Sequence, residues 1–243
     1  MRLLTFTNRT AKEILRDPLT VIFGLGFPIV LILLLSAIQA NIPVSLFEIG
    51  NLTPGITIFG LSFMTLFSST LIAKDRESAL MQRLYTTPLK ATDFILGYAL
   101  PIIPIAVAQS LICYFVAWIL GLKPTITVLY AILFIIPISL FFIGLGLLFG
   151  SIFNVKQVGG ICGALLTNLT AWLSGVWFDL ELVGGAFKKV AYALPFVHAV
   201  ELERAVLSGN YGDIFPHIFW VLGYAALAVA LAIVFFLRQM KKQ

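Results

Sequence analysis

Residues Lys74–Lys90, KDRESALMQRLYTTPLK, form the longest charged interruption in an otherwise apolar chain. The stretch lies between two apolar segments that are each long enough to cross a membrane. Within it, Asp75 to Tyr85 is predicted to form a short helix with Leu80 and Leu84 on one face, because residues i and i+4 share a side of a helix. Thr87-Pro88 ends this helix, since proline lacks an amide donor and disfavours helical geometry in the residue before it. Taken by itself, the stretch is typical of a solvated loop between two spans.

The composition of the chain is that of an integral membrane protein. Of its 243 residues, 60% are hydrophobic and only 11% are charged, and the mean hydropathy is +1.03. Soluble domains carry about 25% charged residues. No sizeable soluble domain is left over, so we predict an all-α membrane protein with a single transmembrane domain over residues 1–243.

Six segments have the length of about 20 apolar residues that a membrane-spanning helix needs. They are Leu19–Gln39, Pro54–Ala73, Phe94–Gly121, Ile126–Phe149, Val158–Phe178 and Ile214–Leu237. The third is long and contains Pro101 and Pro104, which predict a kink or break there. Pro28 and Pro137 are expected to kink the first and fourth spans, with the freed carbonyls satisfied by neighbouring helices.

Residues 1–18 are predicted to form an amphipathic helix that lies in the membrane interface. An apolar stripe of Leu4, Ala11, Ile14 and Leu15 would face the bilayer, and Arg2, Arg9, Lys12 and Arg16 would face anionic headgroups. The alternative is a cleaved signal peptide. The apolar run that follows, Leu19–Ala40, is too long for the hydrophobic region of a signal peptide and ends in no small-residue cleavage site.

Cationic residues gather on one side of the predicted topology. With both termini on that side, it holds twelve of the 16: Arg2, Arg9, Lys12, Arg16, Lys74, Arg76, Arg83, Lys90, Lys156, Arg238, Lys241 and Lys242. Cationic loops remain in the cytoplasm. We therefore expect a multi-pass protein of the plasma membrane whose termini and Lys74–Lys90 stretch are cytoplasmic.

The connection over residues 179–213 is long for an external loop and partly apolar. It contains Leu182–Leu194, then Pro195, then a second helix-like run, Val197–Leu207, and each run is too short to span. We predict a re-entrant pair of short helices that dips into the outer leaflet, because backbone at that depth must satisfy its polar groups within helices or against protein.

The charged stretch resembles a motif of ABC-2 type transporter permeases, the membrane subunits of many ATP-driven exporters. In that family an acidic-basic run ending in Glu precedes two small residues and a Leu, and a Pro follows about one helix length later. This chain has Asp75-Arg76-Glu77, Ser78-Ala79, Leu80 and Pro88. The family more often has Gly-Thr where Ser78-Ala79 stand.

A second part of the resemblance lies around the external connection. Leu173-Ser174-Gly175 ends the fifth predicted span, and Leu194-Pro195 precedes a helix that carries Glu201 and Arg204. The family often has Pro-Leu-Thr-Tyr in place of Pro195-Phe196-Val197-His198, and we interpret His198 as interfacial structure. In order and spacing, the resemblance covers the whole chain.

The resemblance implies that residues 74–90 hold a cytoplasmic coupling helix, which docks in a cleft of a separate ABC ATPase. The residues that it assigns to ATPase coupling are Asp75, Arg76, Glu77, Leu80, Arg83 and Leu84. Lys156, in the short cytoplasmic loop between the fourth and fifth spans, would add a second ATPase contact or belong to a plain turn. ATP and Mg would bind the partner ATPase, and the permease would pair with itself or with a relative.

The chain itself has no recognisable catalytic or cofactor motif. It has no Gly-x-x-x-x-Gly-Lys-Ser/Thr loop for ATP. Cys113 and Cys162 both fall inside predicted spans, and we expect no disulfide framework, no metal site and no nucleic-acid partner. No acid or base lies in the core of a predicted span, whereas proton-coupled carriers keep such costly groups for function. Energy is therefore expected to enter from outside the bilayer.

Small polar side chains are the remaining candidates for a substrate path. Ser62, Thr65 and Ser69 share one face of the second span, and Asn168 and Trp172 lie one helical turn apart in the fifth. Such residues also serve helix–helix packing, because they let spans approach and form hydrogen bonds. The resemblance favours a path, since it places the second and fifth spans at the centre of a dimer.

Together these features predict the non-enzymatic permease subunit of an ATP-driven exporter, coupled to separate ATPase subunits. The alternatives are a secondary carrier or channel, which a charged site within the membrane would favour, and a non-transporting membrane scaffold. Drugs, antibiotic peptides and lipids all suit a path of apolar and hydroxyl side chains. Export as the direction of transport is implied by the resemblance alone.

Overall fold

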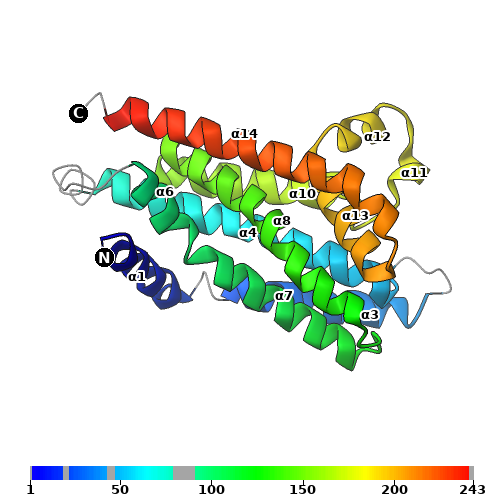
Figure 1. Ribbon diagram of the computed structural model, residues 1–243. Helices are drawn as coiled ribbons and strands as arrows, with labels where there is room; N and C mark the ends of the chain where they lie inside the picture. The colour runs from blue at the N-terminus through cyan, green and yellow to red at the C-terminus, as the bar shows by residue number, and fades with distance from the viewer. Residues whose placement is uncertain (1, 19–21, 43–46, 79–90, 241–243) are drawn as a thin grey trace.

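The structure is a computed structural model that describes residues 2–18, 22–42, 47–78 and 91–240. Over these ranges the chain is all-helical, without a strand. Its elements are α1 (Arg2–Arg16), the π-helix η1 (Ile22–Gly26), α3 (Phe27–Gln39), α4 (Ile49–Glu77), α6 (Ala91–Ala99), α7 (Ile102–Ile119), α8 (Ile126–Ile152), α9 (Val155–Val158), the π-helix η2 (Gly159–Leu166), α10 (Thr167–Leu173), α11 (Leu180–Val183), α12 (Gly185–Tyr192), α13 (Pro195–Ser208), the 3-10 turn η3 (Tyr211–Asp213) and α14 (Ile214–Met240). The long helices run side by side as one bundle (Figure 1).

Five helices within the described ranges are long and apolar enough to cross a membrane: Ile22–Gln39, Ile49–Glu77, Thr92–Ile119, Ile126–Ile152 and Tyr211–Arg238. They correspond to the first four predicted spans and the last. The protein is therefore a multi-pass membrane protein. The remaining predicted span, Val158–Phe178, is not among the five. There the chain is helical from Val155 to Leu173, in the consecutive segments α9, η2 and α10.

Helix α4 forms the centre of the bundle and is buried along almost its whole length. Its closest neighbour is α8, because glycines on α8 remove the side chains that would keep the two backbones apart. A Cβ atom at Gly150 would lie 2.9 Å from the backbone of Ser69, and one at Gly146 would lie 2.9 Å from the Thr65 carbonyl oxygen. The Thr65 hydroxyl donates to the Phe142 carbonyl across this contact, at 2.7 Å. Small and hydroxyl residues are thus the means by which these two helices pack.

The predicted break in the third span is confirmed. Helix α6 ends at Ala99 and α7 begins at Ile102, with Pro101 between them. The other prolines interrupt less: Pro28 occupies the first turn of α3, and Pro54 and Pro137 lie inside α4 and α8, which continue past them.

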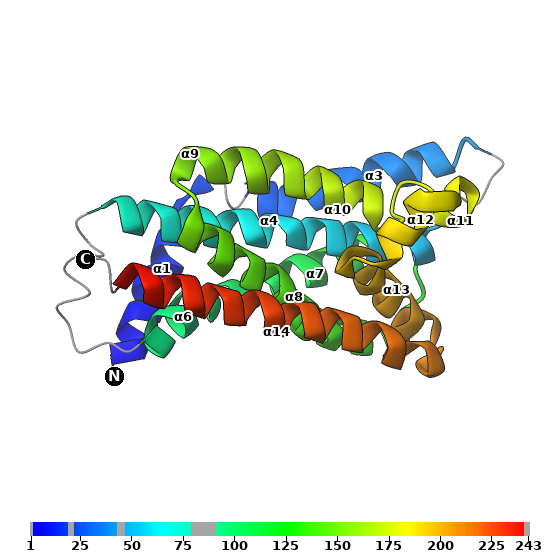
Figure 2. The same cartoon turned by 90° about the horizontal axis from the view of Figure 1, so that it is seen from above.

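Helix α1 lies across one end of the bundle, the end at which α14 finishes (Figures 1 and 2). It packs on α6, where the Phe6 ring contacts Tyr98 edge-on at a centroid distance of 5.0 Å. The predicted apolar stripe divides in the structure. Ile14 is buried against the bundle, whereas Leu4 and Leu15 are 69% and 65% exposed. The prediction that Ile14 faces the bilayer was wrong. Helix α1 has a second apolar face, with Phe6 and Ile14, that packs on protein.

Residues 179–213 contain short helices, as expected, but the first predicted run, Leu182–Leu194, is divided at Gly184 into α11 and α12. The second predicted run, Val197–Leu207, lies within α13, which already begins at Pro195. Helix α13 packs between α4, α8 and α14, while α11 and α12 lie at the end of the bundle away from α1 (Figures 1 and 2). Arg204 of α13 donates to the Gly175 carbonyl at 3.0 Å, which joins the two segments that carry the second part of the resemblance. His198 stacks on Trp220 of α14, at 4.8 Å between ring centroids.

Candidate functional site at the end of α4

The charged run that begins the Lys74–Lys90 stretch is the last turn of α4. The prediction of a separate helix starting at Asp75 was wrong for its first three residues, because α4 continues to Glu77 and stops only at Ser78, whose backbone is extended with φ −94° and ψ 158°. The hydroxyl of Ser78 donates to the Asp75 carbonyl at 2.9 Å, and the Ser78 amide donates to the same carbonyl at 3.3 Å, so this helix end is capped. Leu80, Arg83 and Leu84 lie outside the described residues.

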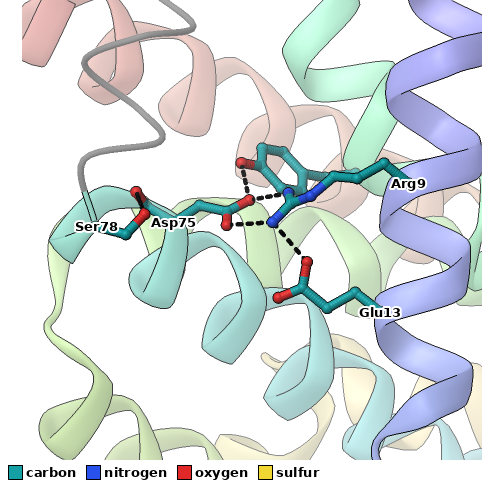
Figure 3. A network of polar contacts seen from close by, with 5 residues as sticks. Arg9, Glu13, Asp75 and Ser78 are labelled. Carbon is teal, nitrogen blue, oxygen red and sulfur yellow. Dashed lines mark hydrogen bonds and ion pairs between the residues drawn. The ribbon is translucent and has the colours of Figure 1, made fainter.

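Asp75 is the buried member of this run, with 3% of its surface exposed. Arg9 of α1 donates to both of its carboxylate oxygens, at 2.5 and 2.8 Å, and the Tyr98 hydroxyl of α6 donates at 2.8 Å (Figure 3). Two-pronged pairing of this kind is the strongest arrangement available to a guanidinium and a carboxylate. It satisfies a charge that would otherwise be costly to bury at the end of an apolar helix.

Arg9 also pairs with Glu13, one turn further along α1, at 2.6 Å (Figure 3). The hydrogen bonds to Asp75 raise the pKa of Arg9 above its ordinary value, with burial opposing them, so the guanidinium stays charged. Burial raises the pKa of Glu13, and the nearby Arg9 charge opposes that rise. The Arg9 side chain thus links α1 to the end of α4 through a fixed charge.

Arg76 and Glu77 connect the same turn to the α8–α9 corner. Arg76 donates to the Gly150 and Phe153 carbonyls at 2.7 and 3.2 Å, where a cation suits the negative end of α8. The Glu77 carboxylate accepts from the Val155 amide at 2.9 Å, at the positive start of the next helix. Asn154 and Gln157 complete a capping box around that start.

Three consecutive residues therefore tie the end of α4 to four elements. Asp75 reaches α1 and α6, Arg76 reaches α8, and Glu77 reaches α9. We call Asp75, Arg76 and Glu77, with these partners, the α4 junction. Lys156 is exposed in α9, next to the residue that Glu77 holds, so the structure brings this sequence-predicted residue to the junction. A displacement of the chain that follows Ser78 would act on all four elements at once.

The five residues predicted to line a substrate path do not come together on one surface. Ser62, Thr65 and Ser69 are fully buried and bond to backbone carbonyls, as the packing alternative predicts. Ser69 also contacts the Cys162 sulfur of η2 at 3.3 Å. Asn168 and Trp172 lie instead on the exposed face of α10. Their role in a path stays a prediction.

Sequence reasoning missed two features of the interior. The first is the pairing of Asp75 with Arg9 and Tyr98; an acid at the end of an apolar span was its only signal. The second is Glu203 of α13, which is fully buried and accepts from the Tyr114 hydroxyl of α7 at 2.8 Å. Burial raises the pKa of Glu203 to about 8. The sequence does not mark Glu203 as buried, because the charges of Glu201 and Arg204 on the same helix are typical of a surface helix. Both of these neighbours are partly exposed in the structure.

Comparison with known proteins shows the family of the chain. Residues 1–207 match the model of a family described as ABC-2 type transporter. The chain is also 30% identical, over 167 residues, to the probable multidrug ABC transporter permease YbhS of Escherichia coli (strain K12), and equally to the protein of that name from Escherichia coli O157:H7. The matched region is 65% of this chain and 43% of each relative, so the chain spans less than half the length of the curated relatives it matches.

Proposed function

The chain belongs to the ABC-2 type transporter family, and on that premise we propose that it is the permease subunit of an ATP-driven exporter, coupled to a separate ABC ATPase. The observation that carries the proposal is the α4 junction. In it, three of the residues that the family resemblance assigns to ATPase coupling, Asp75, Arg76 and Glu77, contact four elements. ATP and Mg would bind the ATPase subunit, and this chain would be non-catalytic.

Coupling would proceed from the segment after Ser78, where Leu80, Arg83 and Leu84 are proposed to meet the ATPase. Closure of the ATPase pair on ATP would push this segment, and α4 would pass the movement to its neighbours. The Arg9–Asp75 pair would carry it to α1, and the Glu77–Val155 bond would carry it to α9. Lys156, exposed at the same corner, would give the second ATPase contact.

The proposed placement in the membrane has six spans, with α9, η2 and α10 together forming the one that is not among the five long apolar helices. Helix α1 would lie in the inner interface, which its position across one end of the bundle supports (Figure 2). Twelve of the 16 basic residues belong to that side, so it and both termini would be cytoplasmic. Residues 179–213, at the opposite end, would form the external re-entrant region.

Two copies, or one copy and a relative, would form the substrate path. Asn168 and Trp172 are exposed on α10 and are available to a second subunit, whereas Ser62, Thr65 and Ser69 would reach a path only when α4 separates from its neighbours. The name of the relatives, probable multidrug ABC transporter permease, supports drug-like substrates. A path of apolar and hydroxyl side chains fits such molecules.

Transport into inverted vesicles tests the proposal. Vesicles that contain the chain and its ATPase should accumulate a labelled amphipathic drug with ATP and not with its non-hydrolysable analogue. Vesicles that contain the ATPase alone should not accumulate it. Accumulation that needs no ATP would contradict the proposal.

A second candidate function is a proton-coupled carrier, and Glu203 is the observation that favours it. Ionisable groups inside a membrane protein often belong to proton relays, and this carboxyl is fully buried with a raised pKa. The two candidates differ in their energy source. Dissipating the proton gradient while ATP is kept constant would stop a carrier and would leave an ATP-driven exporter active.

A further inference from the structure

A groove runs between α1 and the end of α4, and its charges are mostly positive. Its volume is about 820 Å³, and its charged lining residues are Arg9, Lys12, Glu13, Arg16, Asp17 and Lys74. Arg9 is engaged by Asp75 and Glu13. Lys12, Arg16 and Lys74 are exposed and form no ion pair among the described residues. Three cations are thus left to face whatever fills the groove.

An apolar cavity of about 260 Å³ adjoins this groove and shares Glu13, Asp17 and Lys74 with it. Its walls come from α1, η1 and α4, and the apolar ones are Ile14, Phe23, Leu66, Phe67 and Leu71. Pockets for drug-sized ligands measure about 300–1,000 Å³. The cavity is therefore suited to part of a hydrocarbon chain rather than to a whole drug molecule.

The two spaces together match a ligand that has an anionic head and an apolar tail. We propose that the α1–α4 cleft binds one anionic glycerophospholipid, with Lys12, Arg16 and Lys74 around its phosphate and an acyl chain in the cavity behind Lys74. A free phosphate would fill only the groove, and a zwitterionic lipid would gain less from three cations. The site lies beside the Arg9–Asp75 pair, so the bound lipid braces α1 against α4. The inference rests on the inner-leaflet placement of α1 proposed above.

Lipid retention by the purified, detergent-solubilised protein tests this site. The protein is equilibrated with equal amounts of phosphatidylglycerol and phosphatidylcholine of the same acyl chains, and bound lipid is measured by native mass spectrometry. A cation near an anionic headgroup contributes about a fivefold gain in affinity. Lys12→Gln/Lys74→Gln should therefore lower the preference for phosphatidylglycerol about 25-fold. The matched control, Lys123→Gln/Lys189→Gln, removes two cations from the other end and should leave the preference unchanged.

A second variant tests the cavity. Thr70 lines it, and Thr70→Trp should fill it and release the lipid while phosphatidylglycerol's headgroup analogue, glycerol phosphate, binds as weakly as before. Equal retention of both lipids by the unchanged protein would overturn the proposal. So would displacement of the lipid by millimolar inorganic phosphate, which would indicate a simple anion site.

Co-purification of the ATPase, measured in the same samples, separates this inference from the proposed function. Absence of any lipid preference in the unchanged protein, with the ATPase still bound, would overturn the lipid site alone. Absence of the ATPase with the lipid preference intact would overturn the proposed function alone.

Discussion

Arg9 of α1 and Asp75 of α4 form a two-pronged ion pair at 2.5 and 2.8 Å, although 66 residues separate them in the chain. The carboxylate is buried and the guanidinium is about one-third exposed. The pair fixes α1 to the end of the central helix, α4. A movement of the end of α4 would therefore be transmitted to α1 through this ion pair.

Breaking this pair should destabilise the protein. Arg9→Met leaves the Asp75 charge buried, with only the Tyr98 hydroxyl to satisfy it. Loss of one partner of a fully buried pair costs about 3–5 kcal/mol, and the partial exposure of Arg9 places the expected loss below that range, at about 1–3 kcal/mol. Thermal unfolding in lipid-free detergent measures it.

The double variant Arg9→Met/Asp75→Leu should recover part of that loss, because no uncompensated charge then remains. Lys12→Met, an exposed cation of the same helix without an ion pair among the described contacts, should change stability by under about 1 kcal/mol. A Tm for Arg9→Met equal to that of Lys12→Met would contradict a stabilising role for the pair.

Thiol labelling should place the α4 junction in the cytoplasm. Cys113 and Cys162 are both buried, and replacing them with Ala gives a background without native thiols. In intact cells, Asn210→Cys should react with an impermeant external reagent, because Asn210 is exposed at the end opposite α1. Gln157→Cys, beside Lys156, should react only after the membrane is opened. Labelling of Gln157→Cys in intact cells would invert the topology.

Glu203 should make stability fall as the pH rises. Its folded-state pKa, about 8, lies above its ordinary value of 4.5, so the folded protein holds a proton that the unfolded chain releases between these values. The contribution is fully present below pH 4.5 and is lost as the pH rises through about 8. Glu203→Gln keeps a neutral group beside Tyr114, and its Tm should vary less than wild type between pH 6 and pH 8.

Glu201→Gln, a partly exposed neighbour on the same helix, serves as the control and should leave the wild-type pH dependence in place. Equal pH dependence of Glu203→Gln and wild type would show that the buried carboxyl does not titrate as described. ATP-driven transport by Glu203→Gln should persist, whereas a proton-coupled carrier would lose its activity with this carboxyl.

The spans could be predicted from the sequence because about 20 consecutive apolar residues have few other uses. Five of them appear as long helices within a few residues of their predicted bounds. The end of α4 was misplaced because Lys74, Arg76 and Glu77 are good helix formers. A change from apolar to charged residues along the sequence indicates where a span reaches the membrane surface, but the helix can continue beyond that point.

The contacts of the α4 junction could not be predicted from the sequence. The charged run and Lys156 were both singled out, yet nothing local pairs Asp75 with Arg9, since that contact depends on where α1 lies. The burial of Glu203 could not be predicted for a related reason. Its helix carries charges at Glu201 and Arg204, which is typical of a surface helix, and only the packing of α13 among α4, α8 and α14 buries it.

The α4 junction as the point of ATPase coupling is tested by Glu77→Ala. The Glu77–Val155 bond is exposed, so its loss should change stability by less than about 1 kcal/mol. Its loss also removes the hydrogen bond that joins the last turn of α4 to the start of α9. The matched control is Glu181→Ala, an exposed carboxylate at the opposite end that pairs with Lys188.

Substrate-stimulated ATP hydrolysis should be measured on complexes of each variant with the ATPase, at equal amounts of inserted permease. We expect Glu77→Ala to keep a wild-type Tm. Its stimulated rate should fall by at least about tenfold, which corresponds to about 1.4 kcal/mol of coupling free energy. Glu181→Ala should retain the full rate. Full stimulated hydrolysis by Glu77→Ala would contradict the assignment of the α4 junction to ATPase coupling.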